Sequence, residues 1–193
     1  MKRVLLSFVL LPVLFITSCS NFSSIEKHRI GLPEQGDSIM HIFTNQSEQE
    51  LSFLHLQAGQ LTRRDMRSKV YATLKDRMLA TVNDPGNPGV GIAAPQVGIS
   101  KQLIAVQRFD KDGEPFEFYV NPVIETYGST QKWGWEGCLS VPGKRDTVLR
   151  ATRVIISYRD PVSWDILRDT VDGFTAVIFQ HETDHLNGKL YID

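Results

Sequence analysis

The chain ends in QHETDHLNGKLYID, residues 180–193, and this stretch contains HETDH from His181 to His185. Because residues four apart share one face of an α-helix, His181 and His185 can present two imidazole nitrogens to one metal ion. Glu182 then lies beside that ion without binding it, a position that suits a general base. The pattern alone also fits a surface helix that carries two histidines. A catalytic metal site needs a third protein ligand, which the pattern does not supply.

We expect the third ligand upstream of this helix. In zinc peptidases with this pattern it comes further along the chain, as a histidine or a glutamate. Here only residues 186–193 follow, and Asp193 is the sole candidate, on a segment expected to fray. Cys138, in WGWEGCLSVPG (133–143), is the better candidate because a thiolate binds metals well. The alternative for a lone cysteine is a buried, inert thiol.

Composition predicts one soluble domain. The chain has 193 residues, of which 41% are hydrophobic and 22% charged, with a net charge of -1. This length allows one domain with a full core, and the charge balance gives no reason to expect a nucleic-acid partner. We also expect a monomer.

The first residues indicate export. MKRVLLSFVLLPVLFITSC (1–19) has a basic start, a short apolar run and small residues before Cys19, as in a secretory signal. Ile-Thr-Ser-Cys also resembles the bacterial lipobox, which predicts a signal peptide over 1–18 and a membrane-anchored lipoprotein of the cell envelope, lipidated at Cys19. An N-terminal core helix, or a cytoplasmic protein whose signal is not used, are the alternatives. If Cys19 carries lipid, Cys138 has no disulfide partner.

The remaining chain reads as an α+β domain. We expect a polar tether over 19–49, with a strand at Met40–Phe43, followed by the catalytic domain at 50–193. Apolar residues every four positions predict a helix over 63–82, and the helical period returns over 174–186. Alternating segments between these helices predict antiparallel strands at 102–109, 116–125 and 153–160, with a hairpin turn at 110–113.

A glycine-rich stretch adds a third candidate element of the site. In GVGIAAPQVG (89–98), the glycines let the backbone approach a ligand closely, and Gln96 can donate a hydrogen bond. Read alone, the stretch also fits an ordinary glycine-rich turn.

Taken together, the three stretches resemble the peptide deformylase family. That family carries GxGxAAxQ, EGCLS and HExDH in this order, and here these are Gly89–Gln96, Glu136–Ser140 and His181–His185. The similarity covers roughly residues 60 to 193. Around residues 40–60, this chain lacks the Gly-Asp-Pro-x-Leu-Arg-like turn that is usual in the family. The resemblance implies antiparallel β-sheets packed around a central metal-binding helix.

The resemblance also implies a reaction and a set of roles. One divalent ion, Fe2+ in most members and replaceable by Zn2+, Ni2+ or Co2+, is held by Cys138, His181, His185 and a water. Glu182 takes a proton from that water, and the formyl group of an N-formylmethionyl peptide leaves as formate. By the same resemblance, Gln96 and the Leu139 N–H stabilise the oxyanion, and Val90 and Gly91 bind the peptide backbone. Val177 and Ile178 line a pocket for the methionine side chain. Asp184 pairs with Arg150 and braces the metal helix.

The sequence also fits several alternatives. Val177 and Ile178 fit simple core packing as well as a pocket wall. The export signal conflicts with a deformylase that acts on nascent chains in the cytoplasm. An exported metallo-amidase or peptidase acting on other small peptides, a zinc endopeptidase, or a non-catalytic binding module of the same fold would share parts of this pattern.

Overall fold

The computed structural model describes residues 22–31, 38–86 and 88–193. The predicted signal peptide at 1–18 and the predicted lipidation site, Cys19, lie outside these residues. Within the described part of the chain, no helix has the length and apolar character needed to cross a membrane.

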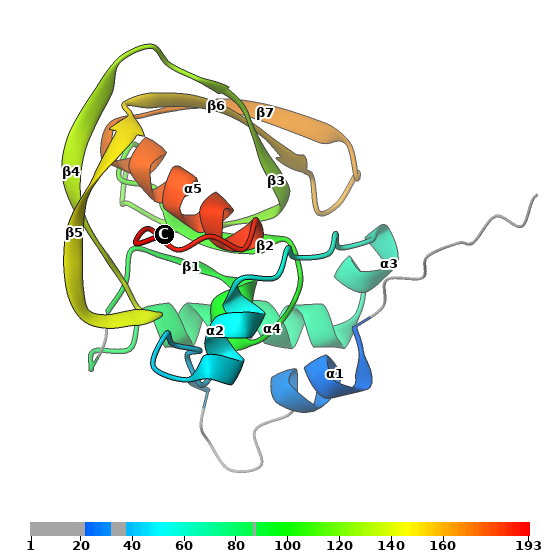
Figure 1. Ribbon diagram of the computed structural model, residues 1–193. Helices are drawn as coiled ribbons and strands as arrows, with labels where there is room; N and C mark the ends of the chain where they lie inside the picture. Colours follow the sequence, from blue (N-terminus) through cyan, green and yellow to red (C-terminus); the bar gives the residue numbers. More distant parts are fainter. Residues whose placement is uncertain (1–21, 32–37, 87) are drawn as a thin grey trace, which may run out of the picture.

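A five-stranded antiparallel sheet forms the centre of the domain, in the order β1-β2-β3-β6-β7 (Figure 1). Its strands are β1 (Gly91–Ala93), β2 (Leu103–Gln107), β3 (Phe116–Tyr127), β6 (Arg153–Arg159) and β7 (Ile166–Asp172). The strands predicted from alternation are confirmed, and β2 and β3 pair as the two arms of a hairpin around the expected turn. The predicted α+β class is confirmed as well.

Helices cover both faces of the sheet near β1 and β2. On one face, Ile92 and Leu103 pack in a cluster with Leu74 of α4 (Lys69–Val82). On the other, Ile104 packs in a second cluster with Phe179 of α5 (Gly173–Leu186). Because successive residues of a strand face opposite sides, a strand covered on both faces must be apolar throughout. This explains the unbroken run LIAV in β2.

A separate two-stranded hairpin curves around α5 (Figure 1). It consists of β4 (Gln131–Cys138) and β5 (Val141–Ala151), which pair antiparallel with a register shift between Gly137 and Cys138. The hairpin and the sheet therefore enclose the predicted metal helix, whose range 174–186 agrees with α5. The helix ends as expected at Asn187, and Gly188 follows with a positive φ of 70°.

The helix predicted over 63–82 is wrong in one respect, because it is two helices. A short helix, α3 (Arg63–Met66), ends before Ser68, and α4 begins after it. The Ser68 hydroxyl donates to the Asp65 carbonyl and accepts from the Tyr71 N–H, so it caps the second helix and interrupts the first.

The segment predicted as a tether also differs from expectation. Its described part contains α1 (Ser24–Ile30) and the start of α2 (Glu48–Leu54), and no strand forms at Met40–Phe43. Phe22 and Ile30 are buried in the cluster that contains α4. Residues 22–31 are therefore a packed element of the domain. The predicted domain boundary at 49–50 falls inside α2, and the boundary at 18–19 stays a prediction.

Candidate metal centre and active site

Helix α5 carries three of the predicted site residues close together. His181 and His185 lie with ring centroids 5.0 Å apart, and Glu182 is 3% exposed. Contacts of Ala176 and Phe179 with the sheet bury the opposite side of the helix. Packing of this apolar side therefore fixes the direction in which the two imidazoles and the carboxylate point.

Cys138 is brought to these histidines by the end of strand β4. Its Sγ lies 3.2 Å from His185 Nε2. One ligand atom each from Cys138, His181 and His185 lies within 4.8 Å of the others, and the described residues hold no other such group of histidine, cysteine or acidic side chains. The structure thus brings together the three ligands that the sequence suggested.

Hydrogen bonds around these residues fit a bound metal ion. The carboxylate of Glu136 can only accept, so the contact of 2.8 Å with His181 places the proton on Nδ1 and leaves Nε2 free for a metal. Two buried side-chain atoms in the described chain lack a hydrogen-bond partner, Glu182 Oε2 and His185 Nδ1. Buried polar atoms are seldom unpaired, and here both belong to residues of this one centre.

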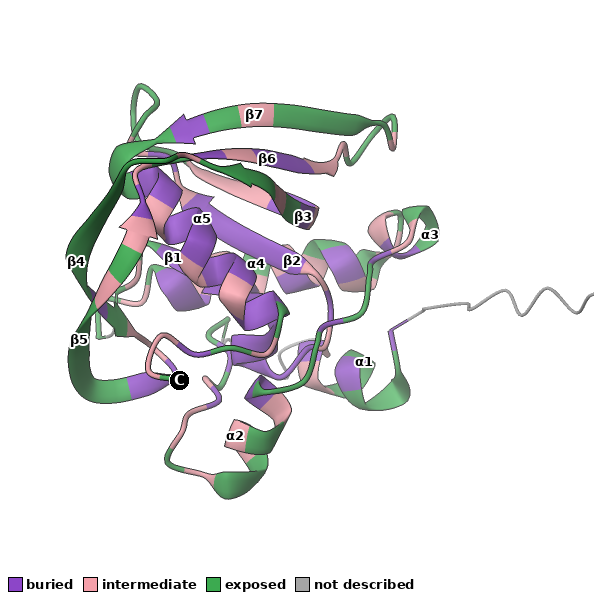
Figure 2. Ribbon diagram, turned by 45° about the horizontal axis from the view of Figure 1, so that its top comes forward, coloured by how far each residue is buried: buried purple, intermediate pink, exposed green. Residues whose placement is uncertain are grey.

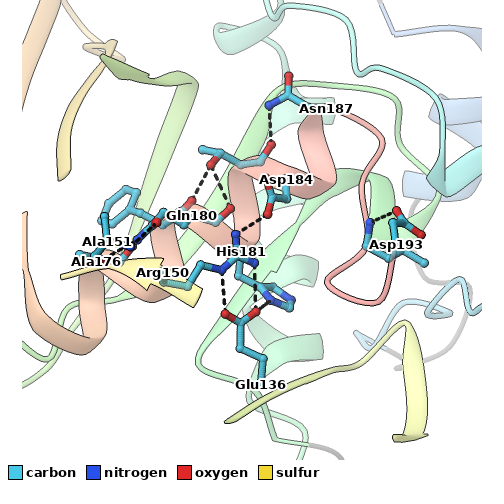
Figure 3. A network of polar contacts seen from close by, with 12 residues as sticks. Glu136, Arg150, Ala151, Ala176, Gln180, His181, Asp184, Asn187 and Asp193 are labelled. Atoms are coloured by element: carbon cyan, nitrogen blue, oxygen red, sulfur yellow. Dashed lines mark hydrogen bonds and ion pairs between the residues drawn. The ribbon is translucent and has the colours of Figure 1, made fainter. Parts of the chain in front are cut away.

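Glu136 is a functional residue to which the sequence reasoning assigned no role. It joins His181 to Arg150, whose Nε donates to Glu136 Oε1 over 2.8 Å, and Arg150 also donates to Asp184 (Figure 3). Burial opposes ionisation, but hydrogen bonds from His181 and Arg150 hold the pKa of Glu136 at about 2. The predicted Arg150–Asp184 pair is confirmed. A carboxylate two residues before a metal-binding cysteine, on the same strand face, was the available signal.

A further contact holds the hairpin on the helix. The Gln180 side-chain amide accepts from the Ala151 N–H and donates to the Ala151 carbonyl, at 3.0 and 2.8 Å (Figure 3). This side chain therefore pairs with the end of β5 as another strand would, one residue before His181.

Glu182 occupies a position that only a glycine neighbour allows. A Cβ on Gly91 would lie 2.4 Å from Glu182 Oε1 and 2.8 Å from Ile178 Cγ2. Burial raises the pKa of the Glu182 carboxyl to about 7, although nearby His181 opposes the shift. A carboxyl that titrates near neutral pH can both take and return a proton, as a general acid and base must.

Gln96 also contacts the cysteine. It belongs to η1 (Ala94–Val97), where its Oε1 accepts from the Ala93 N–H at 2.8 Å. That bond turns Nε2 toward Cys138 Sγ at 3.4 Å and Ser140 Oγ at 3.3 Å. The amide N–H group therefore points into the centre as a hydrogen-bond donor.

A cavity of about 650 Å³ opens onto these groups. The remaining predicted residues line it, namely Val90, Gly91, Leu139, Val177 and Ile178. An adjoining hollow of about 300 Å³ lies between the hairpin and the first turns of α5, with Gly134, Val148, Phe174 and Val177 in its wall. The volumes are those of sites for small molecules and short peptides. Val177 is thus a wall residue, while Ile178 serves both the wall and the core.

Comparison with known proteins gives a consistent result. Residues 40–193 match the family described as polypeptide deformylase. Peptide deformylase 2 of Pseudomonas putida is 44% identical over 124 residues, which are 61% of this chain and 68% of that protein. Peptide deformylase 1 of Bordetella pertussis is 44% identical over 109 residues, which are 53% of this chain and 61% of that protein.

Solved structures show the same similarity over more of the chain. A class I type b peptide deformylase from Acinetobacter baumannii, bound to Met-Ala-Ser, aligns with a TM-score of 0.70 and 35% identity. The alignment covers 80% of this chain and 96% of that one. Peptide deformylase from Thermotoga maritima aligns with a TM-score of 0.68 and 30% identity, over 80% and 96% of the two chains.

Proposed function

Because the chain belongs to the polypeptide deformylase family, we propose that it hydrolyses the N-formyl group of formylated peptides and releases formate. The observation that carries this proposal is the grouping of Cys138, His181 and His185 within 4.8 Å of one another. Cys138 and His181 line one cavity together with Glu182 and Gln96. Members of this family are metal-dependent hydrolases, and this arrangement of residues agrees with that chemistry.

We propose Fe2+ as the ion, with Zn2+, Ni2+ or Co2+ as replacements. One thiolate and two imidazoles suit the later divalent transition metals better than Mg2+ or Ca2+. When bound, such an ion supplies Lewis-acid chemistry, polarising a carbonyl and making water easier to deprotonate. Cys138, His181 and His185 would hold it, and Glu136 would fix the orientation of His181.

Glu182 supplies the proton transfers in this proposal. Its Oε2 has no hydrogen-bond partner, so it is free to accept a proton from the attacking water. The same carboxyl then returns the proton to the departing amine. Close packing of Gly91 against Oε1 leaves the side chain little freedom, and this keeps the reactive oxygen aimed at one place.

The growing negative charge on the formyl oxygen requires donors placed in advance. The Gln96 amide is fixed by its bond from Ala93. Leu139, whose backbone N–H is the second proposed donor, lines the same cavity. Fixed dipoles in a water-poor site stabilise such charge without reorganising during the reaction.

For the substrate, we propose a peptide with an N-formylated methionine. The hollow beside the cavity has mostly apolar walls and the size to accept that side chain, with Phe174 and Val177 on α5. Val90 and Gly91 lie along the cavity wall, where their main-chain groups can pair with the peptide backbone. The Acinetobacter baumannii enzyme has been solved with Met-Ala-Ser, a short peptide that begins with methionine.

Formate release from formyl-Met-Ala-Ser tests the proposed reaction. Protein with iron or nickel bound, purified without oxygen, should release formate, and Glu182→Ala should release it about 1,000-fold more slowly. Casein and a library of unformylated peptides serve as controls for endopeptidase activity. Cleavage of internal peptide bonds without formate release would replace this proposal with a peptidase.

We further propose that the protein is a monomeric lipoprotein of the cell envelope, anchored through Cys19. The support is the basic start, apolar run and Ile-Thr-Ser-Cys sequence at its N-terminus. Labelling with palmitate should mark the wild-type protein and not Cys19→Ala. Equal recovery of both from the cytoplasmic fraction, without label, would contradict export. Sedimentation in detergent tests the monomer.

A further inference from the structure

Helix α1 lies outside residues 40–193, which match the family, yet it packs against the segment that carries Gln96. Phe22 and Ile30 anchor its two ends in the core, at 4% and 1% exposure. The first turn is closed by a capping box between Ser23 and Glu26. The helix is therefore firmly seated, and its side chains can act on the neighbouring segment.

Two charged side chains of α1 bind the backbone directly after Gln96. Arg29 Nη1 donates to the Gly98 carbonyl over 2.6 Å. Glu26 Oε1 accepts from the Ser100 N–H over 3.0 Å. Hydrogen bonds that involve a charged group are stronger than neutral ones. Residues 98–100 are thus held from one side by a helix that is not part of the matched family region.

The backbone conformation of Gly98 and the space beside it suit the contact with Arg29. Its φ is +70°, which an L side chain rarely adopts, and a Cβ there would lie 2.0 Å from Arg29 Nη1. The carbonyl that accepts from Arg29 is therefore presented by a left-handed turn that closes η1. Displacement of this turn would move the end of the 3-10 helix that contains Gln96.

A third contact links α1 to Gln96 itself. The Arg29 guanidinium lies over the Phe43 ring, 4.6 Å from its centroid. The Phe43 N–H in turn donates to the Gln96 carbonyl over 2.7 Å. Arg29 therefore supports the backbone of Gln96 on one side through Phe43 and the following turn through Gly98.

From these contacts we propose that Arg29 and Glu26 are positioning residues, which hold the 96–100 backbone so that the Gln96 amide is aimed at the reacting carbonyl. The proposal rests on the proposed deformylase function. A donor acts on an oxyanion only within a narrow distance, and a displacement of about 1 Å can cost up to about 100-fold in rate.

The attachment of α1 does not depend on Arg29 alone. Arg77 of α4 donates to the main-chain carbonyls of Arg29 and Ile30. Removal of the Arg29 side chain therefore leaves α1 held by Arg77, Phe22 and Ile30. The local effect on the Gln96 segment can then be measured without unfolding the helix.

The test uses the full chain and the substrate formyl-Met-Ala-Ser. Arg29→Ala and Glu26→Ala should each lower kcat by about 10-fold, with KM and bound metal unchanged. Glu26→Gln keeps an acceptor for Ser100 and should restore most of the rate. Lys27→Ala is the matched control, since Lys27 is exposed on the same helix and should leave kcat unchanged.

A double-mutant cycle separates positioning from general destabilisation. If Arg29 acts through Gln96, Arg29→Ala should have little further effect on kcat in a Gln96→Ala background. An equal loss in both backgrounds, or a loss that follows bound metal, would overturn the proposal. Unchanged kcat in Arg29→Ala would overturn it as well.

Hydrogen exchange gives a readout that does not need activity. Arg29→Ala should speed amide exchange in residues 94–100 and leave that in α5 unchanged, whereas Lys27→Ala should change neither. If the wild-type protein releases no formate, the proposed function fails, and exchange alone decides whether α1 holds this segment. Unchanged exchange in Arg29→Ala would then contradict the inference.

Discussion

Helix α5 and the β4–β5 hairpin supply the same metal centre from opposite environments. The helix is buried along most of its length, while the hairpin is exposed along most of its own (Figure 2). Phe179 on α5 has no exposed surface, whereas Trp133 and Trp135 on β4 are 69% and 67% exposed. Two ligands come from the rigid element and one from the exposed element.

This difference shows what the ionic network accomplishes. An exposed hairpin with few apolar contacts can open locally at low cost. Glu136 and Arg150 of the hairpin contact His181 and Asp184 of the helix, so charged pairs hold the two elements together where apolar packing is weak. The cysteine is thereby kept at a fixed distance from the histidines.

The largest effect is expected on the buried side. Glu182→Ala should lower kcat for formate release by about 1,000-fold, because it removes the proton acceptor. Bound metal should stay at the wild-type level, since Glu182 is not among the three ligands. Rate and metal content are measured on one preparation. Loss of metal along with activity would indicate a ligand role for Glu182.

Removing the salt bridges between the hairpin and helix α5 should have the next largest effect. Arg150→Ala leaves Glu136 and Asp184 without their shared partner and should lower the free energy of unfolding by about 3 kcal/mol. Metal affinity should fall by about 10-fold, because His181 loses its orientation. Urea unfolding and competition with a chelator measure the two quantities.

Arg153→Ala is the matched control for Arg150→Ala. Arg153 pairs with Asp172 at the surface, where its side chain is 62% exposed. Such an exposed pair contributes little to stability, so the free energy of unfolding should change much less than in Arg150→Ala, and metal affinity should not change. If the two variants lost equal unfolding free energy and metal affinity, the Arg150 contacts would contribute no more than a surface ion pair.

A smaller effect is expected from filling the hollow between the two regions. A Cβ at Gly134 would meet no atom within 4 Å, so Gly134→Leu should fold normally and occupy the hollow. We expect KM for formyl-Met-Ala-Ser to rise by about 10-fold, with a smaller rise for formyl-Gly-Ala-Ser. Similar changes for both peptides would place the methionine side chain elsewhere.

The smallest effect tests the exposure of the hairpin directly. Leu149→Ala, at a residue that is 42% exposed, should change the free energy of unfolding by no more than about 0.5 kcal/mol. The same truncation at Leu186 of α5, which is 2% exposed, should cost about 3 kcal/mol. Comparable costs would mean that the hairpin is more tightly packed than its exposure indicates.

Local patterns predicted the buried region better than the exposed one. The 181–185 motif and the helical period gave α5, and alternating segments gave β2, β3 and β6. Each of these signals depends on residues that are close in sequence. Cys138 was reached as a ligand because the helix motif lacked one, and the resemblance to a family supported that choice.

The parts that were missed depend on contacts between distant residues. The hydrogen bond between Glu136 and His181 depends on how β4 packs against α5, which no pattern of neighbouring residues predicts. The break at Ser68 depends on a cap that competes with an otherwise helical period. Helix α1 was hidden by polar composition, although Ser23-Ser24-Ile25-Glu26 carries the spacing of a capping box.

Metal titration of the full chain tests whether the exposed hairpin and the buried helix form one metal-dependent deformylase site. Nickel is added in steps to protein first stripped by a chelator, and formate release from formyl-Met-Ala-Ser is measured at each step. We expect the rate to rise linearly with added nickel and to stop rising at one ion per chain. Full activity without metal, or no formate at any nickel level, would contradict it.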